Sequence, residues 1–230
     1  MHEPAVAPGH ARPRERAFGF QEGVQIPGEG GAFEAFFFRD AFKASYFSPP
    51  VSGFRFGVSY SPRFALNQDD PDFDDQTLQR NVVEFAANYV RPVGRWIVGG
   101  SGAVVYGDAD PLTEREDIAS WSVGLEASRR RLTLGAAFVD RGRSNLRATS
   151  DRETEWNIGL AWAARRWRLA SSYAVTLEGD ERDHRLGAGV EVDLLRNLYF
   201  RVDGVGLLQQ ERGDPNQFGF VAVSEVGIRF

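Results

Sequence analysis

From about Phe54 to the C-terminus the chain repeats one unit, a stretch of roughly ten residues with apolar side chains at every second position, followed by a connector. A period of two indicates β-strands whose two faces meet different surroundings. The short connectors lie near Ser48–Gly53, Arg91–Gly94, Arg129–Arg130, Ala164–Arg165 and Leu195–Asn197, and the long ones are Ser61–Arg80, Gly107–Asp117, Arg141–Glu153, Leu177–Asp183 and Gln209–Gln217. This strict alternation predicts an up-and-down meander with two unlike ends, which is typical of a transmembrane β-barrel.

The two faces of each predicted strand differ in charge. In the segment Val83–Tyr89, for example, Glu84 and Asn88 stand opposite an apolar stripe. Within the assigned segments the apolar face carries no charged residue, and an Arg or Lys facing lipid would cost about 2–4 kcal/mol. A soluble β-sandwich shows the same alternation, with its apolar face turned toward the protein interior. Alternation alone therefore does not distinguish a sandwich from a membrane barrel. Near-uniform strand lengths, and aromatic residues near strand ends such as Trp96 and Tyr106, favour the barrel.

The predicted fold is therefore all-β, a transmembrane antiparallel up-and-down β-barrel of about 11–12 strands. Phasing is poorest in Arg201–Leu208, where a β-bulge near Gly204 or Gly206 would restore the alternation. The segment 1–31 is rich in Pro, Gly and charge and is predicted to be flexible, which leaves 32–230 for the barrel.

Composition excludes several classes of protein. The chain has 230 residues, no cysteine and a formal net charge of -5, which argues against disulfide scaffolds, cysteine metal sites and nucleic-acid partners. No apolar run approaches the roughly 20 residues of a membrane helix. The first residues, Met1–Arg16, show no apolar core or cleavage pattern of a secretory leader.

Two stretches resemble the general bacterial porins, particularly those of the α-proteobacterial type. The segment KASYFSPPVSGFRFGVSYSP (Lys43–Pro62) is similar to the strand–turn–strand that follows the folded-in third loop of that family, and VSEVGIRF ends on the aromatic Phe230. The resemblance covers about Phe42–Phe230. It implies an outer-membrane location, contact with lipid and lipopolysaccharide, recognition of Phe230 by the barrel insertion machinery, and a homotrimer.

The strand count bears on how the wall closes. Porins of this type have about sixteen strands, and the strands from Phe42 onward match the sixth to the sixteenth. The resemblance thus implies that the first five strands are absent from this sequence. Two alternatives follow: a truncated porin, or a self-closing twelve-stranded barrel whose extra strand comes from Arg16–Ile26 or Phe33–Arg39.

The expected function is passive diffusion of small hydrophilic solutes and ions, because a pore selects by bore size and lining charge. No cofactor is expected. The predicted lining residues on the polar face are Lys43, Arg55, Glu84, Glu126, Arg131, Arg166, Arg168, Arg185, Glu191, Asp193, Arg201, Asp203, Glu225 and Arg229. By resemblance to the acidic third loop, Glu29, Glu34 and Asp40 are candidates for a constriction.

Other functions have weaker support from the same residues. The acidic cluster Asp69–Asp75 lacks the glycine and terminal glutamate of an EF-hand loop, so no metal site is predicted there. The histidines His2, His10 and His184 accompany no nucleophile elbow, so the chain is not expected to be an enzyme. The alternatives are a non-conducting structural or adhesion barrel, and a porin fragment without a working pore.

Overall fold

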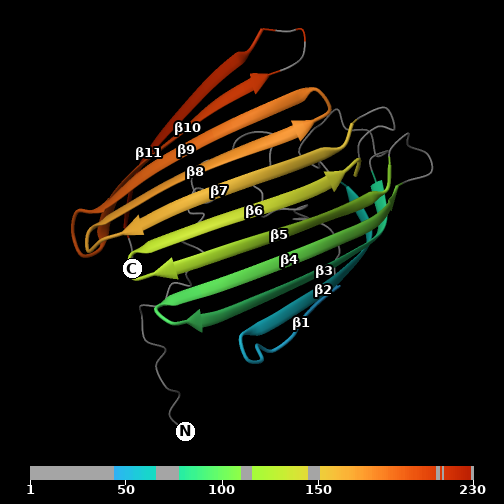
Figure 1. Cartoon of the computed structure of the whole chain (residues 1–230), viewed down its shortest axis with the longest axis horizontal. Coiled ribbons are helices and arrows are strands. Elements are labelled where there is room, and N and C mark those ends of the chain that lie inside the picture. Colours follow the sequence, from blue (N-terminus) through green and yellow to red (C-terminus); the bar gives the residue numbers. More distant parts are fainter. Residues whose placement is uncertain are drawn as a thin grey trace.

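The computed structural model describes residues 44–65, 78–109, 116–144, 151–210, 213 and 215–228. Within these ranges eleven strands form one sheet, each antiparallel to its neighbours and in sequence order (Figure 1). The strands are β1 (Ala44–Phe47), β2 (Phe54–Ala65), β3 (Leu78–Val93), β4 (Trp96–Ala109), β5 (Ile118–Arg129), β6 (Leu132–Gly142), β7 (Glu153–Ala163), β8 (Trp167–Glu178), β9 (Glu181–Asp193), β10 (Leu198–Gln210) and β11 (Gln217–Ile228). The predicted all-β, antiparallel up-and-down architecture is confirmed.

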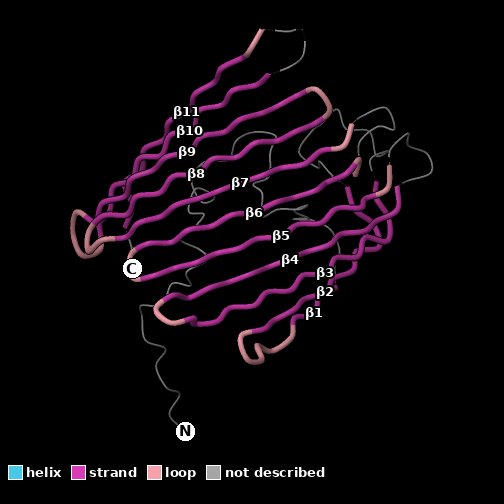
Figure 2. The backbone as a smooth tube through the Cα atoms, viewed as in Figure 1, coloured by secondary structure: helices cyan, strands magenta, loops and turns pink. Residues whose placement is uncertain are grey.

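The sheet is a single curved layer of tilted strands, and every element in the described part of the chain is a strand (Figure 2). No helix among these residues is long and apolar enough to span a membrane. The wall is open in the described residues, because β1 and β11 form opposite edges and do not pair. Both edge strands run in the same direction, so an all-antiparallel closure needs an odd number of further strands between them. Twelve-stranded and sixteen-stranded closures both meet that condition.

The connections of the sheet alternate between two ends. We call the short-turn end the one with the turns at 48–53, 94–95, 130–131, 164–166 and 194–197, and the opposite end the long-loop end. At the short-turn end, Val93 pairs with Trp96 across a two-residue turn, and Gly94 there has a φ of 59°. Glycine adopts this left-handed conformation without a steric penalty, which suits the tight hairpin.

One predicted long connector is wrong. The span Leu177–Asp183 is not a loop, because Glu178 pairs with Glu181 and only Gly179 and Asp180 form the turn. Charged residues at strand ends resemble loop residues in the sequence, yet here they continue the β-ladder beyond its apolar stretch. Gly179 has a φ of 54°, as such a two-residue turn requires.

The predicted bulge near Gly204 or Gly206 is also wrong. β10 keeps an unbroken register with both neighbours from Tyr199 to Gln209. Val205 instead faces the concave side and is buried there. Its apolar side chain therefore fits the regular alternation of the strand, and no bulge is required. The register shifts lie between Arg80 and Val83 and between Asp140 and Gly142.

Candidate functional site

The two faces of the sheet expose opposite kinds of side chain. On β7, Glu155 is 1% exposed while its chain neighbour Trp156 is 56% exposed. The same pattern runs along the sheet, since successive residues of a strand point to opposite faces. The convex, outward face carries exposed apolar residues on every strand from β2 to β11, for example Phe85, Tyr106, Leu125, Ile158, Leu186 and Val226. The other face is the inward one, and it carries the charged side chains described next.

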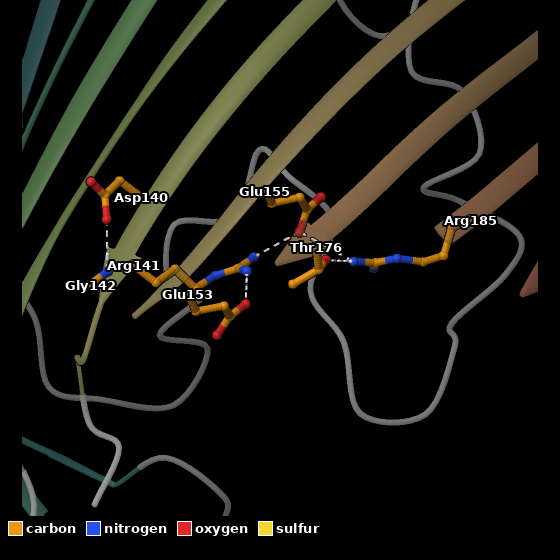
Figure 3. Close-up of polar contacts among 7 residues, drawn as sticks. All are labelled: Asp140, Arg141, Gly142, Glu153, Glu155, Thr176 and Arg185. Atoms are coloured by element: carbon orange, nitrogen blue, oxygen red, sulfur yellow. Dashed lines mark hydrogen bonds and ion pairs between the residues drawn. The ribbon is translucent and has the colours of Figure 1, made fainter. Parts of the chain in front are cut away.

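At the long-loop end the inward face holds a network of two arginines and two glutamates (Figure 3). Arg141 of β6 donates to Glu153 and, at 3.3 Å, to Glu155. Arg185 of β9 reaches Glu155 from the other side at 3.4 Å and also donates to Thr176 of β8. The Glu155 side chain is 2% exposed, and those of Arg141 and Arg185 are 13% and 12% exposed. We call these residues the buried network, because their charges neutralise each other away from water.

Toward the short-turn end the inward face holds a second set of charges. Arg168, Glu191, Arg201 and Glu225 stand directly opposite one another across β8, β9, β10 and β11, alternating in sign. We call these four residues the charge row. Arg168 donates to Glu191 and contacts Asp193 at 3.2 Å, while Arg201 forms an ion pair with Asp203. Opposite charges on directly paired residues stabilise neighbouring strands, so the row also holds this part of the wall together.

Further polar groups lie on the inward face of β2, β3 and β5, to one side of these two sets. Ser59 of β2 donates to Glu84 of β3, whose Cα position is directly opposite. The guanidinium of Arg55 lies 5.7 Å from the ring centre of Phe47, which is a cation–π distance. Glu126 of β5 stands opposite two glycines, Gly99 and Gly135. The two directly paired neighbours of this half-buried carboxylate thus have no side chain.

The outward face becomes polar at the long-loop end, beyond the apolar segments for which the sequence predicted no charge. The strands extend past the apolar segments, and there Trp121 donates to Asp140 at 3.1 Å. Asp140 also accepts from Arg152, and this hydrogen bond raises the pKa of the guanidinium. On neighbouring strands the Tyr173 hydroxyl lies 2.8 Å from Nδ1 of His184. Such pairs of aromatic and polar groups suit a membrane–water interface.

Most predicted lining residues occupy inward-facing strand positions. They are Arg55, Glu84, Glu126, Arg168, Arg185, Glu191, Asp193, Arg201, Asp203 and Glu225. Arg131 and Arg166 instead lie exposed in the turns at the short-turn end. The predicted residues outside the described part of the chain are Lys43, Arg229, Glu29, Glu34 and Asp40, together with the acidic loop 69–75 and Phe230.

The sequence reasoning missed three members of the buried network, Arg141, Glu153 and Glu155. The signal for Glu155 was present, since it alternates with Trp156 in the sequence. Arg141 could not be found that way, because it follows the register shift after Asp140. Among the described residues, no group of three or more His, Cys, Asp or Glu side chains is arranged to hold a metal ion.

Comparison with known proteins supports the predicted family. The sequence matches the Gram-negative porin family over residues 13–203. Among curated proteins, none matches the chain. A porin structure refined at 1.8 Å resolution is similar with a TM-score of 0.53 and 14% identity, over 81% of this chain and 60% of that one. The anion-selective porin from Comamonas acidovorans gives a TM-score of 0.48 and 13% identity, over 81% of this chain and 57% of that one.

The chain thus spans less than two thirds of the length of both solved porins. The family match covers most of the sequence, including the strands that carry the buried network and Arg168 and Glu191 of the charge row. The exposed apolar wall agrees with an outer-membrane location. The chain belongs to the Gram-negative porin family and is a protein of the outer membrane.

Proposed function

We propose that this protein lines a water-filled pore through which small hydrophilic solutes and ions diffuse passively, without bond chemistry. The observation that carries the proposal is the inversion of the wall: charged side chains lie on the concave face while large apolar side chains cover the convex face. In a transmembrane β-barrel, charged side chains on the concave face line the water-filled interior, where they select among the ions that pass. Membership of the porin family supports the same conclusion.

Reconstitution in planar bilayers tests conduction. The full chain, refolded in detergent and inserted, should give discrete current steps in KCl. Because the sequence has no cysteine, single thiols can be placed at will. Ser101→Cys lies on the inward face of β4 and Val98→Cys on its outward face. A bulky thiol reagent should reduce the current steps of the Ser101→Cys protein and leave those of the Val98→Cys protein unchanged.

Two results would contradict the pore. One is verified insertion with no current steps, which would favour the alternative of a non-conducting structural or adhesion barrel. The other is equal block of the Ser101→Cys and Val98→Cys proteins, which would place the ion path outside the concave face. We also propose that the chain is not an enzyme. Hydrolysis of ester substrates by the refolded chain would contradict this.

We also propose three partnerships on the basis of the family. They are assembly as a homotrimer, contact of the long-loop end with lipopolysaccharide, and recognition of Phe230 by the barrel insertion machinery. Chemical cross-linking in outer-membrane vesicles should give a threefold ladder. Deletion of Phe230 should lower the inserted amount without changing the stability of the protein that does insert.

A further inference from the structure

The short turns of the wall are basic. The turns at 94–95, 130–131, 164–166 and 194–197 contain no acidic residue, and each contains at least one arginine. The arginines of these turns, all of them exposed, are Arg95, Arg130, Arg131, Arg165, Arg166 and Arg196. Two more lie at the strand ends beside them, Arg91 on β3 and Arg129 on β5. We call these turn and strand-end arginines together the basic rim.

The carboxylates at this end do not neutralise the basic rim. The nearest ones in the described part of the chain lie on the inward face of strands, and they are Glu126, Glu191, Asp193 and Glu225. Arg168 of the charge row already pairs with Glu191 and contacts Asp193 at 3.2 Å. Among the described residues, no arginine of the rim forms an ion pair with a carboxylate. The arginines of the rim outnumber these carboxylates, so the short-turn end is positively charged.

The basic rim borders the face of the wall that meets lipid. Arg91 is directly paired with Val98, which is 38% exposed on the outward face, so both side chains point outward. The guanidinium of Arg129 lies 5.8 Å from the ring centre of Trp96, a cation–π distance. Tryptophan rings and the stems of long basic side chains are both suited to the boundary between hydrocarbon and headgroups. The rim thus lies at the headgroup level of a bilayer.

The long-loop end differs in its charge. The two-residue turn after β8 contains Asp180, and Glu178 and Glu181 pair across it. Arginines at that end lie among carboxylates, as Arg152 does beside Asp140. The clustering of arginine without acidic neighbours in the turns is therefore a property of the short-turn end.

We propose that the basic rim binds the headgroups of anionic phospholipids and enriches these lipids in the leaflet around the short-turn end. A guanidinium can donate two parallel hydrogen bonds to one phosphate group, and basic groups beside a membrane are attracted to an anionic leaflet. Lipid is favoured over a soluble anion because Arg91 and Arg129 lie on the side of the wall that meets lipid. The inference rests on the outer-membrane location of the wall and is independent of conduction.

Quenching of single tryptophans measures which lipid lies beside the rim. One protein keeps only Trp96, which we call the rim tryptophan, and the other keeps only Trp156 near the long-loop end of β7, which we call the distant tryptophan. The remaining tryptophans are replaced by phenylalanine. Each protein is reconstituted in symmetric vesicles of equal parts phosphatidylglycerol and phosphatidylcholine, with one or the other lipid brominated in its acyl chains. The two quenching curves give the anionic-to-zwitterionic ratio of lipid binding at each tryptophan.

The ratio should be clearly higher at the rim tryptophan than at the distant one. The pair Arg91→Gln and Arg95→Gln should lower it at the rim tryptophan about threefold in 0.1 M salt, because each guanidinium at roughly 6 Å from a lipid phosphate contributes roughly 1.7-fold in screened water. The charge-retaining pair Arg91→Lys and Arg95→Lys should keep it. As a matched control, Arg143→Gln and Arg182→Gln remove two exposed arginines of the long-loop end and should leave it unchanged.

Equal ratios at the two tryptophans would overturn the proposal, and this comparison needs no change in the rim itself. An unchanged ratio after Arg91→Gln and Arg95→Gln would overturn it as well. So would loss of the preference in millimolar inorganic phosphate at constant ionic strength, which would make the rim a site for free phosphate. Salt at about 1 M should weaken the preference, since the screening length falls to about 3 Å. If the protein passes no current while the ratios behave as stated, the pore function fails and the lipid site stands.

Discussion

Glu155 and Trp156 are adjacent in the chain, yet the charged residue is hidden and the large aromatic one is exposed. In a water-soluble sheet with one wet face, the opposite arrangement is expected. The difference shows that the two faces of this wall contact different surroundings, with hydrocarbon outside and polar groups inside. Apolar side chains facing lipid need no protein partner, so exposure on the outward face is no sign of instability.

The inward face itself has two contrasting regions. The buried network around Glu155 is closed, with two arginines converging on one carboxylate. The charge row is linear, with one side chain from each of four strands, and it is more exposed at its two ends, Arg168 and Glu225, than at Glu191 and Arg201 in the middle. Charges of the same chemical types thus converge on one hidden carboxylate in the first region and alternate in sign across neighbouring strands in the second.

The substitution that should separate the two regions most clearly in stability is Glu155→Ala. The change removes the carboxylate on which Arg141 and Arg185 converge, so the buried network of two arginines and two glutamates keeps one glutamate, and we expect the free energy of unfolding to fall by about 3–5 kcal/mol. Glu225→Ala removes an exposed carboxylate from the same face and should cost about 0–1 kcal/mol. Denaturant unfolding in detergent measures both. Equal costs would show that the two regions do not differ in the way that we describe.

A charge placed on each face of one strand tests the inversion of the wall. Val123 of β5 is 43% exposed on the outward face, and Ser122 beside it faces inward. Val123→Arg should lower the free energy of unfolding in lipid bilayers by about 2–4 kcal/mol, because the guanidinium meets hydrocarbon. Ser122→Arg meets a polar lumen and should cost clearly less. If the two variants are equally stable, the outward face is not in lipid.

The faces of the strands could be predicted from the sequence because period-two alternation is a local pattern. It predicted the inward position of Arg168, Glu191 and Arg201 and the outward position of Trp156. The pairing of these charges could not be predicted, since it depends on register between strands. Register fixes that Arg168 faces Glu191, and no single strand contains that information.

The pattern failed where strands begin and end. Arg131 and Arg166 were assigned by extending the alternation, but both lie in turns. Leu177–Asp183 has the composition of a loop, yet most of it belongs to β8 and β9. Arg141 lies after a register shift, where counting every second residue no longer predicts which face of the sheet a side chain points to. Turn length and bulges depend on backbone geometry, which composition reports only weakly.

The smallest expected effect concerns the turns that separate the two ends. Gly94 has a φ of 59°, and a methyl group added there would meet no atom within 4 Å, so Gly94→Ala tests the backbone conformation alone. It should cost about 1–2 kcal/mol in unfolding free energy. Gly102→Ala, in mid-strand, would meet only an ordinary contact at 3.5 Å and should cost less. A neutral Gly94→Ala would contradict the left-handed turn.

Tryptophan quenching by lipids tests the inverted wall most directly. The chain is reduced to the single tryptophan Trp156, with the others replaced by phenylalanine, and is compared with a protein whose only tryptophan is at Ser101→Trp on the inward face. Lipids brominated in their acyl chains should quench Trp156 strongly and the inward tryptophan weakly, while aqueous iodide should do the reverse. Quenching of Trp156 by iodide but not by brominated lipid would contradict the account.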